Sequence, residues 1–273
     1  MTTWFITGAS SGFGRAFAEY ALDQGHNVAA AARNMAALRE IEALAPERVL
    51  AVGLDVTKPD QAVAAVEAAV ARFGRIDVLI NNAGYSIVGA FEETPDAELR
   101  AVMETNFYGV MNVTRAALPQ LRAQRAGAVV NISSLGGQLS MGGFGAYSAS
   151  KFALEGMSEA LAQELAPFGV KVLIVEPGQF RTALAGAVMR RMEVRAEYRD
   201  IVAGIREFAD GMDGTQPGNP YKAAAAIETA LAAERTPLRL QLGPDGVDAV
   251  REHARTLLAD LEAWEGVGRA TVF

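Results

Sequence analysis

Residues 4–14 read WFITGASSGFG, an apolar run that leads into three glycines spaced G-x-x-x-G-x-G. The run 4–8 is typical of a buried β-strand, and a helical pattern follows the last glycine. Glycines at a strand-to-helix turn permit tight backbone angles and let N–H groups approach a pyrophosphate at the helix N-terminus. The spacing differs from the standard G-x-G-x-x-G fingerprint, and glycines also simply make turns. For a dinucleotide cofactor, the expected contacts in this loop are Gly8, Ser10, Ser11, Gly12, Phe13 and Gly14.

Short apolar runs alternate with helical patterns along most of the chain. Six further segments resemble strands, namely 27–33, 49–56, 77–84, 128–134, 171–178 and 237–242. Most are apolar on both faces, as strands covered by helices on both sides are. Residues 59–73 and 96–124 instead repeat apolar side chains at helical spacing. The pattern predicts an α/β fold: one Rossmann-like domain over 1–273, with about seven strands in a doubly wound parallel sheet and helices on both faces.

One stretch departs from this rhythm. Residues 183–210 look helical but follow no strand of their own, and 211–220 (GMDGTQPGNP) form a turn-rich break. The insert, 183–220, follows the carboxyl end of a strand, where open α/β sheets bind ligands, so it is a candidate substrate lid. It carries arginines four residues apart among acidic residues, at positions 191, 195 and 199. We expect a solvated, salt-bridged helix face there rather than a binding patch.

Composition excludes several function classes. The net charge is −7 and no basic run stands out, which argues against nucleic-acid binding. There is no Cys, and His26 and His253 lie far apart, so thiolate chemistry, a Ser-His-Asp hydrolase and a metal site are all unsupported. No apolar segment reaches the roughly 18 residues that span a bilayer, and the N-terminus enters a strand without a leader pattern. We expect a cytoplasmic protein without a membrane span.

Polar residues at other strand ends extend the cofactor prediction. The second strand ends in Ala32-Arg33, with no carboxylate to grip a ribose 2′-hydroxyl and one cation suited to a 2′-phosphate. NADP(H) is therefore favoured and NAD(H) remains possible; the alternative is a surface arginine. Asp55, beside Val56, offers an acceptor for an adenine amino group. Asn81-Asn82-Ala83-Gly84 follows the fourth strand, although Asn, Asp and Gly are ordinary turn residues.

The stretch YSASK places Tyr147 one helical turn before Lys151. A free phenol has a pKa near ~10, and a neighbouring ammonium lowers it by favouring the phenolate. Tyr147 then suits proton exchange with a carbonyl or alcohol oxygen, and Ser134, at the end of the fifth strand, can bond to the same oxygen. Asn106, on an otherwise apolar helical stripe, is a candidate for holding a proton-relay water. Taken alone, Ser134 reads as a strand-end hydroxyl and Asn106 as a core amide.

Together these residues resemble the short-chain dehydrogenases/reductases, in the branch with single-domain chains of this length. The motifs are TGASSGFG, NNAG, Asn106, Ser134 thirteen residues before Tyr147, YSASK, and PGQFRT (177–182). The resemblance implies a Ser-Tyr-Lys centre of Ser134, Tyr147 and Lys151, with Asn106 completing a proton relay.

The resemblance also implies roles around the cofactor. Lys151 would hold the nicotinamide ribose, Asn81 would support the cofactor site, and Thr182 would contact the carboxamide. The cofactor set is completed by Arg33, Asp55, Val56, Ala83, Gly84, Tyr147, Pro177, Gly178 and Phe180. Members are usually homodimers or homotetramers. The C-terminal third, including an amphipathic end helix, is similar to bacterial hydroxysteroid/retinol-dehydrogenase-like members.

The leading hypothesis is an NADP(H)-dependent enzyme interconverting an alcohol and a ketone or aldehyde. Apolar side chains near the expected site favour a bulky apolar small-molecule substrate, unless they are core residues: Leu135, Leu139, Met141, Phe144, Phe180, Leu184, Val188 and Met192. One alternative is a non-catalytic dinucleotide-binding regulator on the same fold, whose signature would be loss of the Ser, Tyr or Lys. A second is an epimerase or dehydratase, which more often has different glycine spacing and a larger C-terminal domain.

Overall fold

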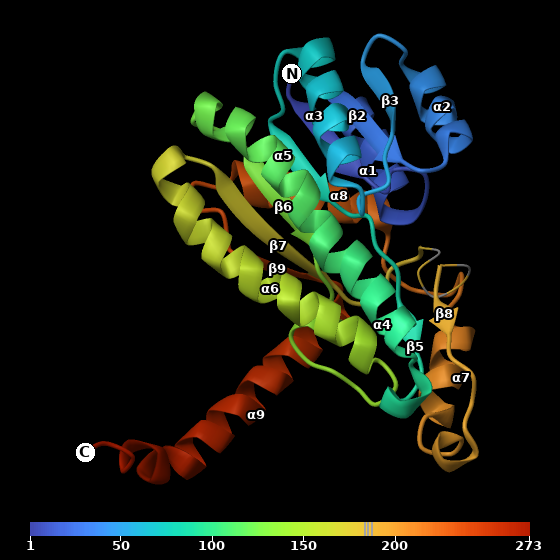
Figure 1. Ribbon diagram of the computed structural model, residues 1–273. Helices are drawn as coiled ribbons and strands as arrows, with labels where there is room; N and C mark the ends of the chain where they lie inside the picture. The colour runs from blue at the N-terminus through green and yellow to red at the C-terminus, as the bar shows by residue number, and fades with distance from the viewer. Residues whose placement is uncertain (183, 185, 187) are drawn as a thin grey trace.

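A seven-stranded parallel sheet forms the centre of the molecule, in the order β3-β2-β1-β4-β6-β7-β9 (Figure 1). The computed structural model describes residues 1–182, 184, 186 and 188–273. The strands are β1 (Thr3–Thr7), β2 (Asn27–Ala32), β3 (Val49–Gly53), β4 (Val78–Asn81), β6 (Ala128–Ile132), β7 (Lys171–Pro177) and β9 (Arg239–Leu242). Each predicted strand segment holds one of them, to within one residue, so the predicted fold class is confirmed.

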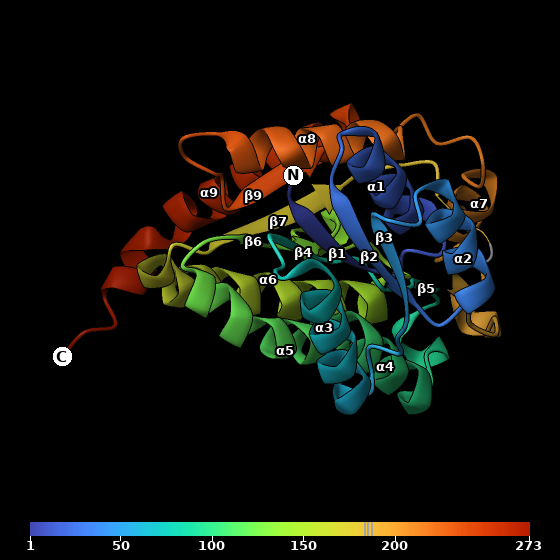
Figure 2. The ribbon, with the colours of Figure 1, turned by 90° about the horizontal axis from the view of Figure 1, so that it is seen from above.

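Helices cover both faces of this sheet (Figure 2). One face carries α1 (Gly12–Asp23), α2 (Met35–Leu44) and α8 (Pro220–Ala232); the other carries α3 (Pro59–Phe73), α5 (Gly109–Gln124) and α6 (Gly145–Leu165). Successive side chains of a strand point to opposite faces. Trp4 accordingly packs in the core beneath the first set of helices, and Phe5 in the core beneath the second.

Local sequence signals set several helix ends. In α3, Pro59 occupies the first turn, and Gly74 ends the helix with a left-handed φ of 79°. In α8, the Asn219 side chain accepts hydrogen bonds from the backbone N–H groups of Tyr221 (2.9 Å) and Lys222 (3.4 Å). These caps satisfy backbone groups that would otherwise lack intrahelical partners.

The helical segment predicted at 96–124 is present but interrupted. It consists of α4 (Asp96–Met103), a π-helical turn (Glu104–Tyr108) and α5. The π turn inserts an extra residue into the helical repeat, a feature that often marks functional sites. Here it places Asn106 in the interior, with its side chain fully buried.

The prediction of a helix over 183–210 is wrong for most of that segment. Residues 183, 185 and 187 lie outside the described residues. From there the chain forms a short strand, β8 (Arg190–Arg191), parallel to β5 (Ile87–Val88), and becomes α-helical only in α7 (Ala203–Gly211). The physical reason is long-range pairing: the backbone N–H groups of Arg190 and Met192 donate to the carbonyl oxygens of Ser86 and Val88.

The expected helix face of arginines is absent for the same reason. Arg191 lies in β8 and pairs with Asp210 of α7 at 2.6 Å, whereas Arg195 pairs with Glu92 at 3.2 Å. The segment does carry salt bridges, but to partners outside the residues that the sequence pattern grouped together.

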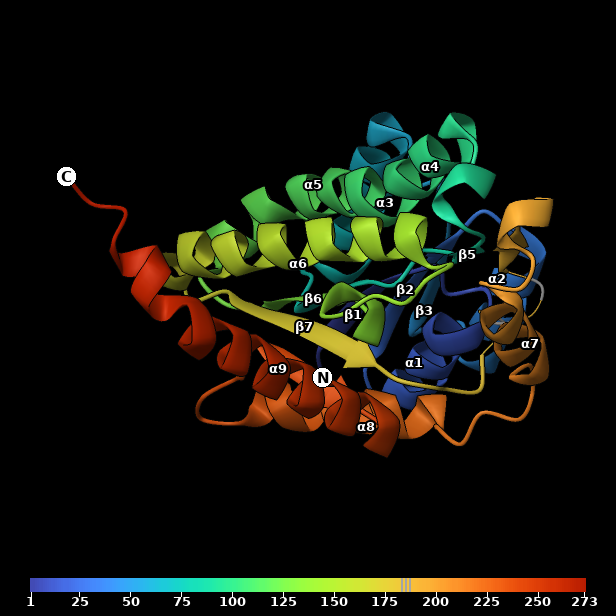
Figure 3. The same cartoon turned by 90° about the horizontal axis from the view of Figure 1, so that it is seen from below.

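The final helix, α9 (Pro244–Arg269), leaves the body of the molecule after its first turns (Figure 3). Its start lies beside β9, and all residues from 254 to the C-terminus are exposed. No helix in the described part of the chain is long and apolar enough to cross a membrane.

Candidate active site

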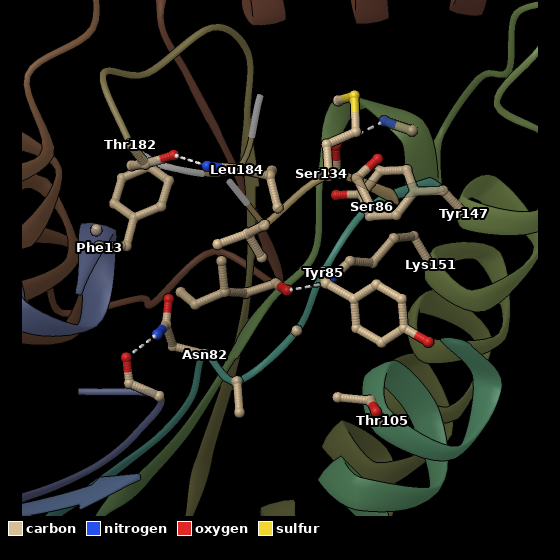
Figure 4. Close-up of a pocket in the computed structure, with 18 of the residues that line it drawn as sticks. Phe13, Asn82, Tyr85, Ser86, Thr105, Ser134, Tyr147, Lys151, Thr182 and Leu184 are labelled. Carbon is tan, nitrogen blue, oxygen red and sulfur yellow. Dashed lines mark hydrogen bonds between the residues drawn. The ribbon is translucent and has the colours of Figure 1, made fainter. Parts of the chain in front are cut away.

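A cavity of about 1060 Å³ lies at the carboxyl ends of the central strands. It includes the point between β1 and β4 where the strand order reverses, the usual ligand site of a doubly wound sheet. Ser134, Tyr147 and Lys151 lie on one side of it, across from Phe13, Asn82 and Thr182 (Figure 4).

The glycine loop, residues 8–14, forms the wall of the cavity on the side of Phe13, Asn82 and Thr182. Gly8 and Gly12 have positive φ values of 65° and 53°, which side chains rarely adopt. Gly14 is required by space, because a Cβ there would lie 2.6 Å from the Asn82 amide nitrogen. Ser11 precedes α1 but makes no side-chain cap, so the loop keeps its first helical N–H groups for another acceptor.

Thr7 and Asn82, to which the sequence motifs gave no separate role, fasten this loop to β4. The Thr7 hydroxyl accepts from the backbone N–H groups of Asn82 (2.9 Å) and Ala83 (3.0 Å). The Asn82 amide donates to the carbonyl oxygens of Thr7 (2.9 Å) and Gly8 (3.3 Å). The two loops are therefore positioned by one small hydrogen-bond network.

Arg33 follows the last residue of β2 and lines the cavity there. Asp55 and Lys58 also line the cavity. Burial would raise the pKa of Asp55, but hydrogen bonds from Thr57 and the Arg33 charge outweigh it and lower that pKa. One Asp55 oxygen already accepts from the Thr57 backbone (3.0 Å) and hydroxyl (2.8 Å). Two cations thus stand at this end beside one ionised, partly satisfied carboxylate.

On the opposite wall, Tyr147 and Lys151 are both buried on α6. The Lys151 ammonium lies 5.8 Å from the centroid of the Tyr147 ring and donates to the carbonyl oxygen of Ile132 at 2.8 Å. Ser134 sits at the start of the 3-10 turn Leu135–Gly137, with its hydroxyl held by the Gly136 N–H at 3.0 Å. The predicted triad is therefore assembled in space.

Burial dominates the ionisation of this pair. It raises the pKa of Tyr147 to about 12, and a hydrogen bond with Ser134 opposes only part of that rise. It lowers the pKa of Lys151 to about 8, against the charge of Glu155. The Tyr147 pKa is therefore raised in the protein alone and not lowered as expected, because removing the phenol from water disfavours the phenolate more than the Ser134 hydrogen bond favours it.

The Asn106 side chain is largely occupied. Its oxygen accepts from the Tyr85 N–H (3.1 Å), and its amide nitrogen donates to the Tyr85 carbonyl (2.9 Å) and to Ser150 Oγ (3.0 Å). Gly84 lies close to both Asn106 and Lys151: a Cβ on this glycine would lie 3.0 Å from Asn106 Oδ1 and 3.8 Å from Lys151 Nζ.

The segment after β7 closes one edge of the cavity. Phe180 packs on Phe13 with ring centroids 5.2 Å apart, and the Gly12 position faces Thr182. Asp245, at the start of α9, also lines the cavity and accepts from the Gln179 N–H at 2.7 Å. That aspartate is the second residue of α9, after Pro244, and its sequence context gave no signal.

The structure brings most of the predicted cofactor residues to this cavity, with exceptions. Gly14 and Asn81 do not line it, and neither does Asn106, the residue predicted for the proton relay. Asn81 faces away, because alternation along β4 turns its buried amide toward Thr114 (2.9 Å) and Asn131 (2.8 Å), leaving Asn82 at the cavity. The predicted lining side chains from Leu135 to Val188 are present; Met192 is not among them, because it follows β8 and packs over Gly89.

Comparisons with known proteins agree with this architecture. Residues 2–193 match the family model described as short chain dehydrogenase. A crystal structure of a short-chain dehydrogenase from Streptomyces avermitilis is 50% identical, with a TM-score of 0.93 and 100% coverage of both chains.

Two further proteins are similar. A 3-ketodihydrosphingosine reductase from Bacteroides thetaiotaomicron is 40% identical over 241 residues, which cover 88% of this chain and 87% of the relative. A short chain dehydrogenase/reductase from Burkholderia phymatum, solved in complex with NAD, is 27% identical with a TM-score of 0.81, covering 92% of each chain. With the Ser, Tyr and Lys assembled beside a glycine loop, this chain belongs to the short chain dehydrogenase/reductase family of oxidoreductases, which act on CH–OH groups.

Proposed function

We propose that this protein uses NADP(H) to interconvert an alcohol and a ketone or aldehyde with a bulky apolar body. The observation that carries the proposal is the buried Tyr147–Lys151 pair, with Ser134 beside the phenol, across one cavity from the glycine loop. That arrangement supplies an acid/base group, a second hydroxyl for the reacting oxygen and a place for a dinucleotide.

The loop residues fit a dinucleotide. Gly8 and Gly12 have positive φ, and no side chain caps the start of α1, so backbone N–H groups are available to a pyrophosphate. Ser10, Ser11 and Phe13 line the same wall. When bound, the cofactor supplies or accepts the hydride. Thr182 would bind its carboxamide, and Pro177, Gly178 and Phe180 would border its nicotinamide end.

The preference for NADP(H) over NAD(H) rests on the other end of the cavity. Arg33 follows β2 directly and Lys58 lies nearby, whereas NAD-preferring sites usually have an acidic residue at that strand end. A 2′-phosphate would gain charge-assisted hydrogen bonds from these cations. Asp55 and Val56 would face the adenine.

In the reduction direction, Tyr147 donates a proton to the substrate carbonyl oxygen, and in oxidation it takes one from the alcohol. Ser134 donates a hydrogen bond to the same oxygen. Lys151 would bind the nicotinamide ribose, and its positive charge would favour the phenolate form, against the burial that raises the Tyr147 pKa. Asn106, held by the backbone of Tyr85 behind Lys151, completes the relay through which Tyr147 regains the proton that it donates.

The substrate side of the cavity is mostly apolar. Leu139, Met141 and Phe144 line it from the turn before α6, and Phe208 and Met212 from the insert after β7. We infer that the described part of this insert, residues 184, 186 and 188–220, covers bound substrate as a lid. The name of the Bacteroides relative makes 3-ketodihydrosphingosine, a ketone, a reasonable first substrate to assay.

A panel of apolar ketones, aldehydes and alcohols, assayed by cofactor absorbance with NADPH and NADH in parallel, tests the proposal. We expect turnover of at least one ketone–alcohol pair, with NADPH preferred. Binding of NADPH without turnover of any member by wild-type protein would favour a regulatory role instead.

A further inference from the structure

Behind the reacting groups, two glutamates are buried side by side. Glu155 lies one helical turn after Lys151 on α6, and Glu176 lies on β7; the residues are only 4% and 0% exposed. Isolated carboxylates are costly to bury, so a buried pair needs charge compensation, hydrogen bonds or a bound proton.

The two carboxylates share the same donors. The Gln138 amide nitrogen donates to Glu155 Oε2 (3.2 Å) and Glu176 Oε1 (3.0 Å). Arg239 Nε lies 3.1 Å and 3.5 Å from the same two oxygens. Gln241 donates to the other oxygen of Glu176 at 2.7 Å. A single guanidinium therefore serves two buried acids.

One arginine does not neutralise two carboxylates, and Arg239 also pairs with the half-exposed Glu159 at 3.0 Å. A proton held by one member of the pair would reduce the negative charge left uncompensated there. Burial raises the pKa of Glu176 to about 7, with the Gln241 hydrogen bond opposing that rise and the Glu155 charge adding to it. Burial also raises the pKa of Glu155.

This pair contacts the catalytic centre from behind. Gln138 ends the 3-10 turn that begins at Ser134, so its bonds to both acids fix that turn. Gly137 of the same turn presses on Glu155, since a Cβ there would lie 3.1 Å from Glu155 Oε1. Lys151 has a neutral carbonyl as its hydrogen-bond acceptor, and Glu155 is the anion that opposes the burial of its charge.

We propose that Glu155 is a positioning residue of the active site. Glu155 and Glu176 share one proton. Together they keep the buried Lys151 in its ammonium form and hold the turn that begins at Ser134. The role of Lys151 rests on the proposed function. When the pair releases its shared proton, the negative charge behind Lys151 increases, and the lysine keeps its own proton to a higher pH. The charge that stabilises the Tyr147 phenolate is thereby maintained.

Other ionisable groups reach the pair from neighbouring elements. From β9, Arg239 faces both acids, and from the next turn of α6, Glu159 faces Arg239. Asp245 of α9 lies beyond β7 and accepts from the Gln179 N–H. The phenol of Tyr147 lies on the cavity side of Lys151.

Carbon-13 labelling of lysine Cε gives a direct test, because the chain has four lysines and the Lys151 signal is identified by its loss in Lys151→Met. The protein is titrated without substrate or cofactor. In wild type we expect the Lys151 signal to show a step near pH 7, from the glutamate pair, and its own titration at higher pH. In Glu155→Gln, which keeps the shape and an acceptor for Gln138, the step should vanish and the lysine should titrate about one pH unit lower.

Two variants complete the design. Glu176→Gln should remove the step but shift the lysine titration less than Glu155→Gln does. Glu159→Gln, on the same helix and the same arginine but half-exposed, should leave the Lys151 titration unchanged. Equal lysine titrations in Glu155→Gln and Glu159→Gln would overturn the proposal. So would a wild-type titration without the step near pH 7, which decides the matter even if Glu155→Gln does not fold.

The titration does not depend on knowing the substrate, so its failure is distinguishable from failure of the proposed reaction. Once a substrate is identified, Glu155→Gln should move the rising limb of alcohol oxidation to higher pH by about one unit, because a less charged Lys151 stabilises the phenolate less. A substitution that merely loosened the fold would lower kcat without shifting this limb of the pH profile.

Discussion

The fit between the glycine loop and the first helix makes Gly14→Ala an informative substitution. In an ordinary exposed helix, replacing Gly by Ala stabilises the protein by about 0.5–1 kcal/mol, because Ala has less backbone entropy to lose. At Gly14 the added methyl would lie 2.6 Å from Asn82 Nδ2 and closer still to the carbonyl oxygen of Gly8, which is backbone and cannot rotate away. Overpacking of this kind typically costs about 1–3 kcal/mol, so we expect net destabilisation.

The same methyl forces apart the two loops that Asn82 joins. NADPH affinity should fall about tenfold or more, equivalent to about 1.4 kcal/mol. Gly156→Ala is the matched control, because Gly156 lies exposed on α6 with nothing within 4 Å of a Cβ. Urea unfolding and fluorescence titration with NADPH measure the two effects. A Gly14→Ala protein as stable as Gly156→Ala, with wild-type NADPH affinity, would refute the packing argument.

Three further substitutions probe separate parts of the molecule. Arg33→Asp should lower the ratio of kcat/KM for NADPH over NADH by about ten- to hundredfold, by replacing charge-assisted phosphate bonds with repulsion; an unchanged ratio would remove Arg33 from the phosphate site. Glu93→Gln should cost about 3 kcal/mol of unfolding free energy at neutral pH, because it leaves the largely buried Arg206 without its carboxylate. Burial would raise the pKa of Glu93, but two backbone N–H groups and Arg206 hold it below 4.5. The wild type therefore loses the stabilisation by the ionised Glu93 as the pH falls from 4.5 through the lower pKa of the folded state, and the variant does not. Urea unfolding above and below that pH range checks the sign. Phe208→Ala should raise KM for an apolar ketone about three- to tenfold with little change in kcat, and an unaltered KM would place α7 outside the substrate site.

The sheet was predictable because its central strands, β1, β4 and β6, are buried along their whole length and therefore form short apolar runs. The β5–β8 pair was not, because two-residue strands leave no periodicity, and the arginines around 191 happen to recur at helical spacing. The π turn that internalises Asn106 was equally invisible, since it changes the helical phase without changing composition.

The placement of Ser134, Tyr147 and Lys151 at one cavity could be predicted from sequence, because Tyr147 and Lys151 share one helix and Ser134 follows a recognisable strand. Asn81 and Asn82 show the limit of such reasoning. Adjacent residues at a strand end face opposite sides, so a one-residue error in phase exchanges a core amide for a cavity residue. Glu155 and Glu176 could not be paired from sequence, because a helix glutamate ordinarily faces solvent and their common partner, Arg239, comes from a distant strand.

The central claim is that Tyr147 donates the proton in the reaction. The most direct test measures the rate of hydride transfer in the Tyr147→Phe variant, together with its NADPH affinity by fluorescence. Removing only the phenolic oxygen deletes the proton donor while leaving the ring packed and the glycine loop untouched. The account predicts that kcat/KM falls by about 10²–10⁴-fold with NADPH affinity retained. Turnover close to wild type, with the same NADPH affinity, would contradict it.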